Sequence, residues 1–129
     1  MLANRRRDTS AEWKVRRLLH ARGLRYRVDL PLPFDQRRRA DITFTRAKVV
    51  VFIDGCFWHG CPQHYVPPKS HPEYWIPKIE ANRARDAQTT HQLEELGWTV
   101  LRCWEHEDPR AVVEQVVAAL AERAAPAPA

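Results

Sequence analysis

Two aspartates in the first half of the chain have the types and spacing of a magnesium site. Asp41 lies inside one β-rich run, and Asp54 lies at the end of the next. If these runs are adjacent antiparallel strands, the two carboxylates can meet at one edge of a sheet. Carboxylates of this kind hold Mg²⁺, which polarises a scissile phosphate and helps to generate an attacking hydroxide. The alternative is that neither residue is catalytic. Asp41 could then be an exposed edge residue or pair with Arg39, and Asp54 could form a turn before Gly55.

Two further residues could assist at this site. His59 follows Asp54 in the same loop, and its neutral imidazole could accept a proton from water near the metal. Glu12 could reach the site as an outer-shell carboxylate. Thr9 and Glu12 also have the S/T-x-x-E spacing of a helix capping box, and from spacing alone both roles of Glu12 stay open.

Cysteines and histidines gather after Asp54 in the spacing of a structural zinc site. Cys56-x4-Cys61-x2-His64 supplies three ligands, and His106 can complete a tetrahedron. Two close cysteines beside histidines favour a metal site over a disulfide in a reducing compartment. The remaining cysteine, Cys103, could be a ligand, but its alternating strand pattern favours a small core residue.

Positive charge is concentrated in the first third of the chain. The sequence has 21 Lys+Arg and 16 Asp+Glu, for a net charge of +5, and its pI is about 9.5. Residues 1–46 carry 13 basic and 5 acidic side chains, net +8, whereas residues 47–129 carry 8 and 11, net −3. A solvated tail or loop would also be rich in arginine, but two runs are predicted to contact the phosphates of a partner: Arg5, Arg6, Arg7, Arg37, Arg38 and Arg39.

The order of the elements predicts an α/β fold with a mixed sheet flanked by helices. Helices are expected at about 10–23, 73–96 and 109–124, and strands at 26–30, 40–44, 49–53 and 99–104. Pro31 and Pro33 should end the first strand, and the turn at 45–48 should make a hairpin. We expect one domain over residues 1–125 and a disordered tail at 126–129.

Apolar runs stay below the roughly 18 residues of a membrane span, so we expect a cytoplasmic protein that does not bind membranes. Phe57 and Trp58 are consecutive aromatic residues in the predicted metal-fastened loop. Such rings can wedge between base pairs of DNA, or they can cap the core beneath the loop.

Residues 54–61, Asp-Gly-Cys-Phe-Trp-His-Gly-Cys, resemble the Gly-Cys-Phe-Trp-His hallmark of the very-short-patch (Vsr) mismatch-repair endonucleases. Similar segments occur in the same order from Arg-Asp-Thr-Ser-Ala-Glu at 7–12 to Val-Leu-Arg-Cys-Trp-Glu at 100–105. The resemblance covers residues 5–107 approximately, which is most of the chain.

The resemblance implies a fold related to type II restriction endonucleases and a nick 5′ of the thymine in a T:G mismatch left by deamination of 5-methylcytosine. Its expected partner is mismatched double-stranded DNA. We further expect a monomer associated with the nucleoid, with mismatch-repair proteins as partners. Carried over by position, the family's functional residues fall on the Mg²⁺-binding Asp41, the catalytic His59, the active-site Glu12, the intercalating Phe57, Trp58 and Trp75, and Asn82 among the DNA contacts.

The sequence departs from the family pattern in three ways. Asp54 stands where the best-known members have a histidine, so a second metal-binding carboxylate could replace a proton relay. The zinc residues Cys61, His64 and His106 match only after small shifts, and Ala40 replaces a proline. Three alternatives therefore stay open: a restriction or homing nuclease with no mismatch requirement, a non-catalytic zinc-stabilised DNA-binding module, and an RNA-directed nuclease.

Overall fold

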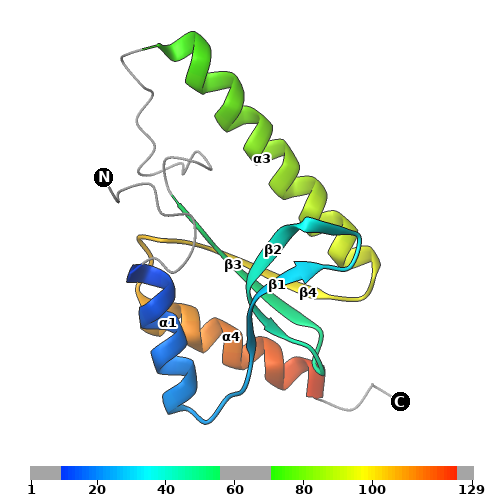
Figure 1. Cartoon of the computed structure of the whole chain (residues 1–129). Coiled ribbons are helices and arrows are strands. Elements are labelled where there is room, and N and C mark those ends of the chain that lie inside the picture. The colour runs from blue at the N-terminus through cyan, green and yellow to red at the C-terminus, as the bar shows by residue number, and fades with distance from the viewer. Residues whose placement is uncertain (1–9, 56–70, 125–129) are drawn as a thin grey trace.

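A four-stranded sheet between two layers of helices forms the framework of the protein. The computed structural model describes residues 10–55 and 71–124. The elements, in chain order, are α1 (Ser10–Ala21), β1 (Arg27–Leu32), β2 (Asp35–Phe44), β3 (Val49–Asp54), α3 (Pro72–Glu95), β4 (Thr99–Trp104) and α4 (Pro109–Ala124). Helices α1 and α4 lie on one side of the sheet and α3 lies on the other (Figure 1). The predicted mixed sheet flanked by helices is confirmed.

The sheet combines antiparallel and parallel pairing in the order β1-β2-β3-β4. Strands β1, β2 and β3 pair antiparallel through short turns, as the predicted hairpin requires. Strand β4 pairs parallel with β3, and α3 lies between them in sequence. Because parallel neighbours need a long crossover, α3 must span the sheet before β4 can begin.

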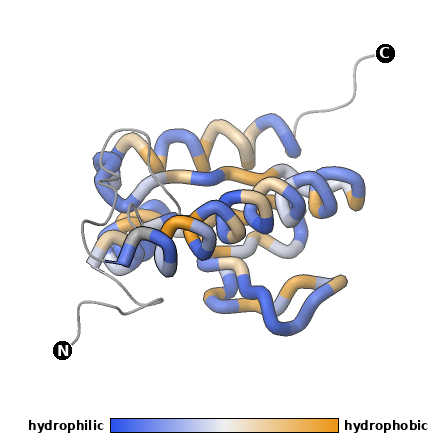
Figure 2. The backbone as a smooth tube through the Cα atoms, turned by 90° about the horizontal axis from the view of Figure 1, so that it is seen from above, coloured by the Kyte–Doolittle hydropathy of each residue, from blue (hydrophilic) through white to orange (hydrophobic). Residues whose placement is uncertain are grey.

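Strand β3 is buried on both faces and supplies two cores. Successive side chains of a strand point to opposite faces. Accordingly, Val49 and Val51 pack with α1 and α4, whereas Val50 and Phe52 pack with Leu93 of α3. Cys103 is buried in the first of these cores, so its predicted core role is confirmed. Figure 2 shows hydrophobic and hydrophilic residues alternating along the helices. Such a pattern gives a helix one apolar side that can pack against the sheet.

The prediction that Pro31 ends the first strand at residue 30 is wrong. Strand β1 continues to Leu32, and Pro31 pairs with Arg39 of β2. A proline lacks the N–H that an interior strand must donate, but β1 is an edge strand, and the register shifts just after Pro31. Strand β2 consequently begins at Asp35, and residues 37–39 belong to a strand instead of a loop.

The helix ends agree closely with the glycines and prolines of the sequence. Gly23 and Gly97 have φ values of 77° and 89°, a left-handed conformation that stops a helix and favours glycine. Pro109 begins α4, where its missing N–H has no helical partner to lose. In the described parts, 10–55 and 71–124, no helix is both long and apolar enough to cross a membrane.

Candidate active site

Asp41 lies where the main-chain pairing of β2 and β3 gives way to a side-chain contact. The last pair of the ladder before Asp41 joins Ile42 to Val51. Next to it, the Oδ2 atom of Asp41 accepts the backbone N–H of Ile53 at 2.6 Å. The carboxylate therefore takes the place of a strand carbonyl, and this contact fixes it between the two strands.

Negative charge surrounds the Asp41 carboxylate. The pKa of Asp41 is raised to about 8, mainly by burial and next by the carboxylate of Glu12, with smaller increases from Asp54 and Asp29. The hydrogen bond from Ile53 acts in the opposite direction. Acidic side chains from α1, β1 and β3 thus converge on the aspartate that the sequence singled out.

Glu12 faces this cluster from the first helix. Its side chain is only 1% exposed, and its Oε2 atom pairs with Arg16 at 3.2 Å, one turn further along α1. The Glu12 carboxylate also contributes to the raised pKa of Asp41, so its charge acts on that residue. Its proposed capping partner, Thr9, lies outside the described residues.

Asp54 is held by an arginine that the sequence analysis did not select. Nη1 of Arg102 lies 3.1 Å from each carboxylate oxygen of Asp54, whose residue is 8% exposed. The parallel register places Arg102 of β4 beside Phe52 of β3, two residues before Asp54. The only sequence signal for this role was a cation inside an otherwise apolar strand.

Asp41 and Asp54 have the chemistry of a magnesium site, although they do not form a complete cage. Within residues 10–55 and 71–124, no three Asp, Glu, His or Cys side chains are grouped closely enough to hold a metal ion. Mg²⁺ usually takes one or two carboxylates and completes its shell with water and substrate phosphate. The pKa of Asp41 is raised first by burial and then by neighbouring negative charge, which a divalent cation would offset, so this donor set fits Mg²⁺.

Most of the predicted zinc site falls outside the described residues, as do His59, Phe57, Trp58 and the arginines at 5–7. The unplaced zinc ligands are Cys56, Cys61 and His64. His106 is exposed in the turn after β4. At this end of the sheet, Glu105 donates its backbone N–H to the carbonyl of Asp54 at 2.9 Å. His106 therefore lies just past the end of the sheet at which β3 also ends.

Helix α3 carries the two described DNA-contact candidates that come from the resemblance. Trp75 and Asn82 are both partly buried. The Trp75 ring meets the exposed Tyr74 ring edge to face, with centroids 4.9 Å apart. Asn82 accepts a hydrogen bond from Arg85 at 3.3 Å. The N-terminal part of α3 extends away from the sheet in Figure 1.

The arginine run of β2 is partly engaged within the protein. Arg38 donates to Thr89 of α3 at 2.5 Å and pairs with Asp35 at 3.2 Å. Arg39 donates to the carbonyl of Asp29 at 2.8 Å. Arg37 and Arg39 are exposed, whereas Arg38 is partly buried, so the three side chains do not form one uniform surface.

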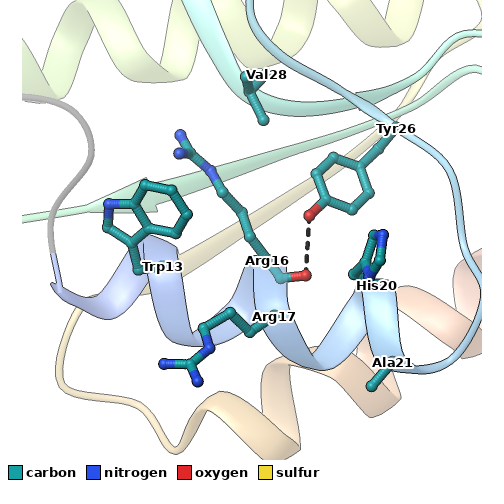
Figure 3. A pocket seen from close by; sticks show the side chains of 7 residues that line it. All are labelled: Trp13, Arg16, Arg17, His20, Ala21, Tyr26 and Val28. Carbon is teal, nitrogen blue, oxygen red and sulfur yellow. Dashed lines mark hydrogen bonds between the residues drawn. The ribbon is translucent and has the colours of Figure 1, made fainter.

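A groove of about 480 Å³ lies between α1 and the start of β1, and Trp13, Arg16 and Tyr26 are among the residues that line it. The Arg16 guanidinium lies 5.4 Å from the centre of the Trp13 ring, and Tyr26 donates its hydroxyl to the Arg16 carbonyl at 2.8 Å (Figure 3). Arg17 and His20 complete its polar lining. Arg16 thus contacts both this groove and Glu12, and no sequence motif had indicated the groove.

Comparison with known proteins identifies similar sequences over most of the chain. The family model described as DNA mismatch endonuclease Vsr matches residues 1–64. The type II nicking enzyme V.NaeI of Lentzea aerocolonigenes is 45% identical over 119 residues, which cover 91% of this chain and 72% of that protein. V.XorIIP, a type II nicking enzyme of Xanthomonas oryzae pv. oryzae, is 44% identical over 108 residues, covering 80% and 74%.

The DNA mismatch endonuclease Vsr of Escherichia coli is also similar. It is 39% identical over 101 residues, which cover 77% of this chain and 62% of the Escherichia coli protein. The segment matched by the family model contains Asp41 and the two carboxylates, Glu12 and Asp54, that contribute to its raised pKa.

Proposed function

The chain belongs to the Vsr family of DNA mismatch endonucleases, and from this premise we propose that it nicks duplex DNA 5′ of the thymine in a T:G mismatch with Mg²⁺ as cofactor. The observation that carries the proposal is the Asp41 carboxylate, fixed between two strands and approached by Glu12 and Asp54. Such a concentration of acidic groups favours a bound cation, and a cation beside DNA can act on a phosphodiester.

The described residues have separate roles in this proposal. Asp41 and Asp54 hold the Mg²⁺, which would supply Lewis-acid polarisation of the scissile phosphate. Glu12, held by Arg16, is the outer carboxylate that accepts hydrogen bonds from water at the site. His59 is the proton acceptor for the attacking water.

The remaining candidates engage DNA or fasten the loop. Intercalating aromatic rings open the duplex at the mismatch, where unstacking costs only a few kcal/mol. A structural Zn²⁺ holds the loop that presents two of these rings. The proposed residues are Phe57, Trp58 and Trp75 for intercalation, Asn82 and the arginines at 5–7 and 37–39 for DNA contact, and Cys56, Cys61, His64 and His106 for zinc.

A nicking assay tests the proposal directly. The substrates are an end-labelled duplex with one T:G mismatch and its matched T:A counterpart, each incubated with Mg²⁺. Asp41→Asn removes the charge of the central carboxylate but keeps its shape. Glu122→Gln makes the same chemical change on the exposed C-terminal turn of α4 and is the matched control. We expect a nick on the thymine strand of the T:G duplex with the wild type and Glu122→Gln, and none with Asp41→Asn.

Two other results would overturn the proposal in different ways. Equal cutting of the T:G and T:A duplexes would favour a nuclease with no mismatch requirement. Binding of either duplex without any Mg²⁺-dependent cutting would favour a zinc-stabilised DNA-binding module. An unchanged nick with Asp41→Asn would remove Asp41 from the metal site even if the activity itself were present.

A further inference from the structure

Arg102 occupies a position in the described part of the chain that its sequence context does not explain. It lies on β4, between the partly buried Leu101 and the buried Cys103, and pairs in register with Phe52 of β3. Its guanidinium carbon lies 4.1 Å from the centre of the Phe52 ring. Placing a guanidinium between the sheet and α3 costs desolvation free energy, even over an aromatic ring. A position that served only for packing would not need a charged side chain.

The guanidinium of Arg102, on β4, contacts three residues on two other elements. Nη1 binds both oxygens of Asp54 on β3 at 3.1 Å. Nε donates to the hydroxyl of Thr90 on α3 at 2.8 Å, and Nη2 donates to the backbone carbonyl of Asp86 on the same helix at 3.3 Å. Because a guanidinium is planar and its donors have fixed directions, these bonds fix the Asp54 carboxylate relative to α3.

Glu12 and Asp54 therefore each have an arginine, and the carboxylate between them does not. Arg16 pairs with Glu12 from α1, and Arg102 pairs with Asp54 from β4. Asp41 accepts a backbone N–H but forms no ion pair with any residue in 10–55 or 71–124. The two arginines offset charge at the sides of the site and leave Asp41 as the carboxylate with the strongest need for a cation.

The geometry points to Arg102 as a positioning residue for the nick: it orients Asp54 for the metal and connects that carboxylate to α3, the helix that carries Trp75 and Asn82. This inference rests on the proposed function, because it assigns Arg102 to the same metal site. Hydrogen-bond partners of metal-binding carboxylates fix ligand orientation, and their loss typically lowers metal affinity or activity about 10- to 100-fold.

Three variants distinguish a role of Arg102 in orienting Asp54 from a role only in attaching α3 to the sheet. Arg102→Lys keeps a positive charge near Asp54 but cannot hold Asp54, Thr90 and Asp86 together. Arg102→Met removes the charge and keeps most of the apolar stem. Thr90→Val removes one anchor of the guanidinium without changing any charge. The matched control is Arg123→Met, since Arg123 also ties two elements together, donating to the carbonyl of Ala47 at 2.8 Å from α4.

The measurements are the nicking rate as a function of Mg²⁺ concentration, Mg²⁺ binding to the DNA-free protein by calorimetry, the melting temperature, and affinity for T:G duplex in Ca²⁺. For Arg102→Lys we expect a near-normal melting temperature and duplex affinity. Nicking should nevertheless be about 10- to 100-fold slower, with weaker Mg²⁺ binding in calorimetry. Thr90→Val should show a smaller loss in the same two measurements, and Arg123→Met should show none.

Wild-type nicking and Mg²⁺ binding in Arg102→Lys and Thr90→Val would overturn the inference. The same holds if Arg102→Met lowers the melting temperature while its folded fraction keeps the wild-type rate and Mg²⁺ dependence, since the arginine would then only attach α3. If Arg102→Met does not fold, Arg102→Lys and Thr90→Val decide the question. Failure of the wild type to nick the T:G duplex would instead refute the proposed function itself.

Discussion

Asp41 is the residue on which the electrostatics of the site depend. Its neighbours Glu12 and Asp54 each pair with an arginine, and their carboxylates add to the effect of its own burial on its pKa. The pKa of Asp41 is consequently raised to about 8, so without a divalent cation the carboxyl group holds a proton at neutral pH. Binding of the proposed Mg²⁺ at Asp41 would therefore displace a proton, and it would become easier as the pH rises.

The raised pKa predicts that the metal-free protein loses stability as the pH increases. The ordinary pKa of an aspartate is 3.8, and that of Asp41 in the folded protein is about 8. Between these values the folded state binds a proton that the unfolded state does not bind. Unfolding then releases this proton, and the free energy of unfolding falls by up to about 1.4 kcal/mol per pH unit.

Urea unfolding of the wild type and Asp41→Asn, in a chelator at several pH values between 5 and 8, measures this contribution. The asparagine cannot ionise, and its side-chain oxygen can still accept the N–H of Ile53. The stability difference between the variant and the wild type should therefore grow in favour of the variant as the pH rises. Parallel pH curves for the two proteins would show that Asp41 ionises at its ordinary pKa.

At the scale of elements, local patterns predicted most of the fold. The alternation at Thr99–Trp104, the Pro109 start of α4 and the glycine at 97 each act through neighbouring residues, and the elements lie where these signals place them. The extent of β1 was predicted wrongly because Pro31 is acceptable only at the edge of a sheet. Whether a strand is at an edge depends on the tertiary arrangement, which the local sequence does not contain.

The same distinction applies to the candidate site. Asp41 and Asp54 could be paired from sequence because a short turn joins their strands, and neighbouring antiparallel strands bring their ends together. Arg102 could not be found in this way. It reaches Asp54 across 48 residues of sequence, through a parallel pairing that forms only after α3 has crossed the sheet.

Two leucines near the C-terminal end of helix α3 should contribute very differently to the free energy of unfolding. Leu93 is 0% exposed and packs with Val50 and Phe52, whereas Leu96, just past the helix, is 50% exposed. Leu93→Ala should lower the free energy of unfolding by about 2–5 kcal/mol, because it leaves a cavity between α3 and the sheet. Leu96→Ala should change it by no more than about 0.5 kcal/mol. Urea unfolding of the two variants makes the comparison, and equal losses would mean that α3 is not packed on the sheet through Leu93.

At the scale of the whole molecule, the positive charge and part of the proposed site lie in the same segment of the chain. Residues 1–46 carry a net charge of +8 and also contain Glu12 and Asp41, so the acidic site is set within the most basic third of the sequence. The basic side chains attract the DNA backbone, and the local carboxylates attract a cation. The proposed function needs both attractions, since it brings a metal ion and a phosphate to one place.

The proposed zinc ion would join parts of the chain that are far apart in sequence, so its removal should affect the molecule as a whole. Residues 55–71 connect β3 to α3, and His106 follows β4 at the sheet edge from which this connection begins. A closed site made by Cys56, Cys61, His64 and His106 would contribute its binding free energy to folding. Stripping the metal with a chelator and restoring Mg²⁺ alone should therefore leave a lower melting temperature, and added Zn²⁺ should restore it.

His106→Ala should lower both the zinc content and the melting temperature, measured by elemental analysis and thermal unfolding. His91→Ala is the matched control, because His91 is an exposed histidine on α3 that pairs with Glu95 at 2.6 Å. A full zinc content in His106→Ala would show that a residue other than His106 is the fourth zinc ligand. A melting curve unaffected by removal of bound zinc would refute the structural role, because a site that closes this connection must stabilise the folded state over the unfolded one.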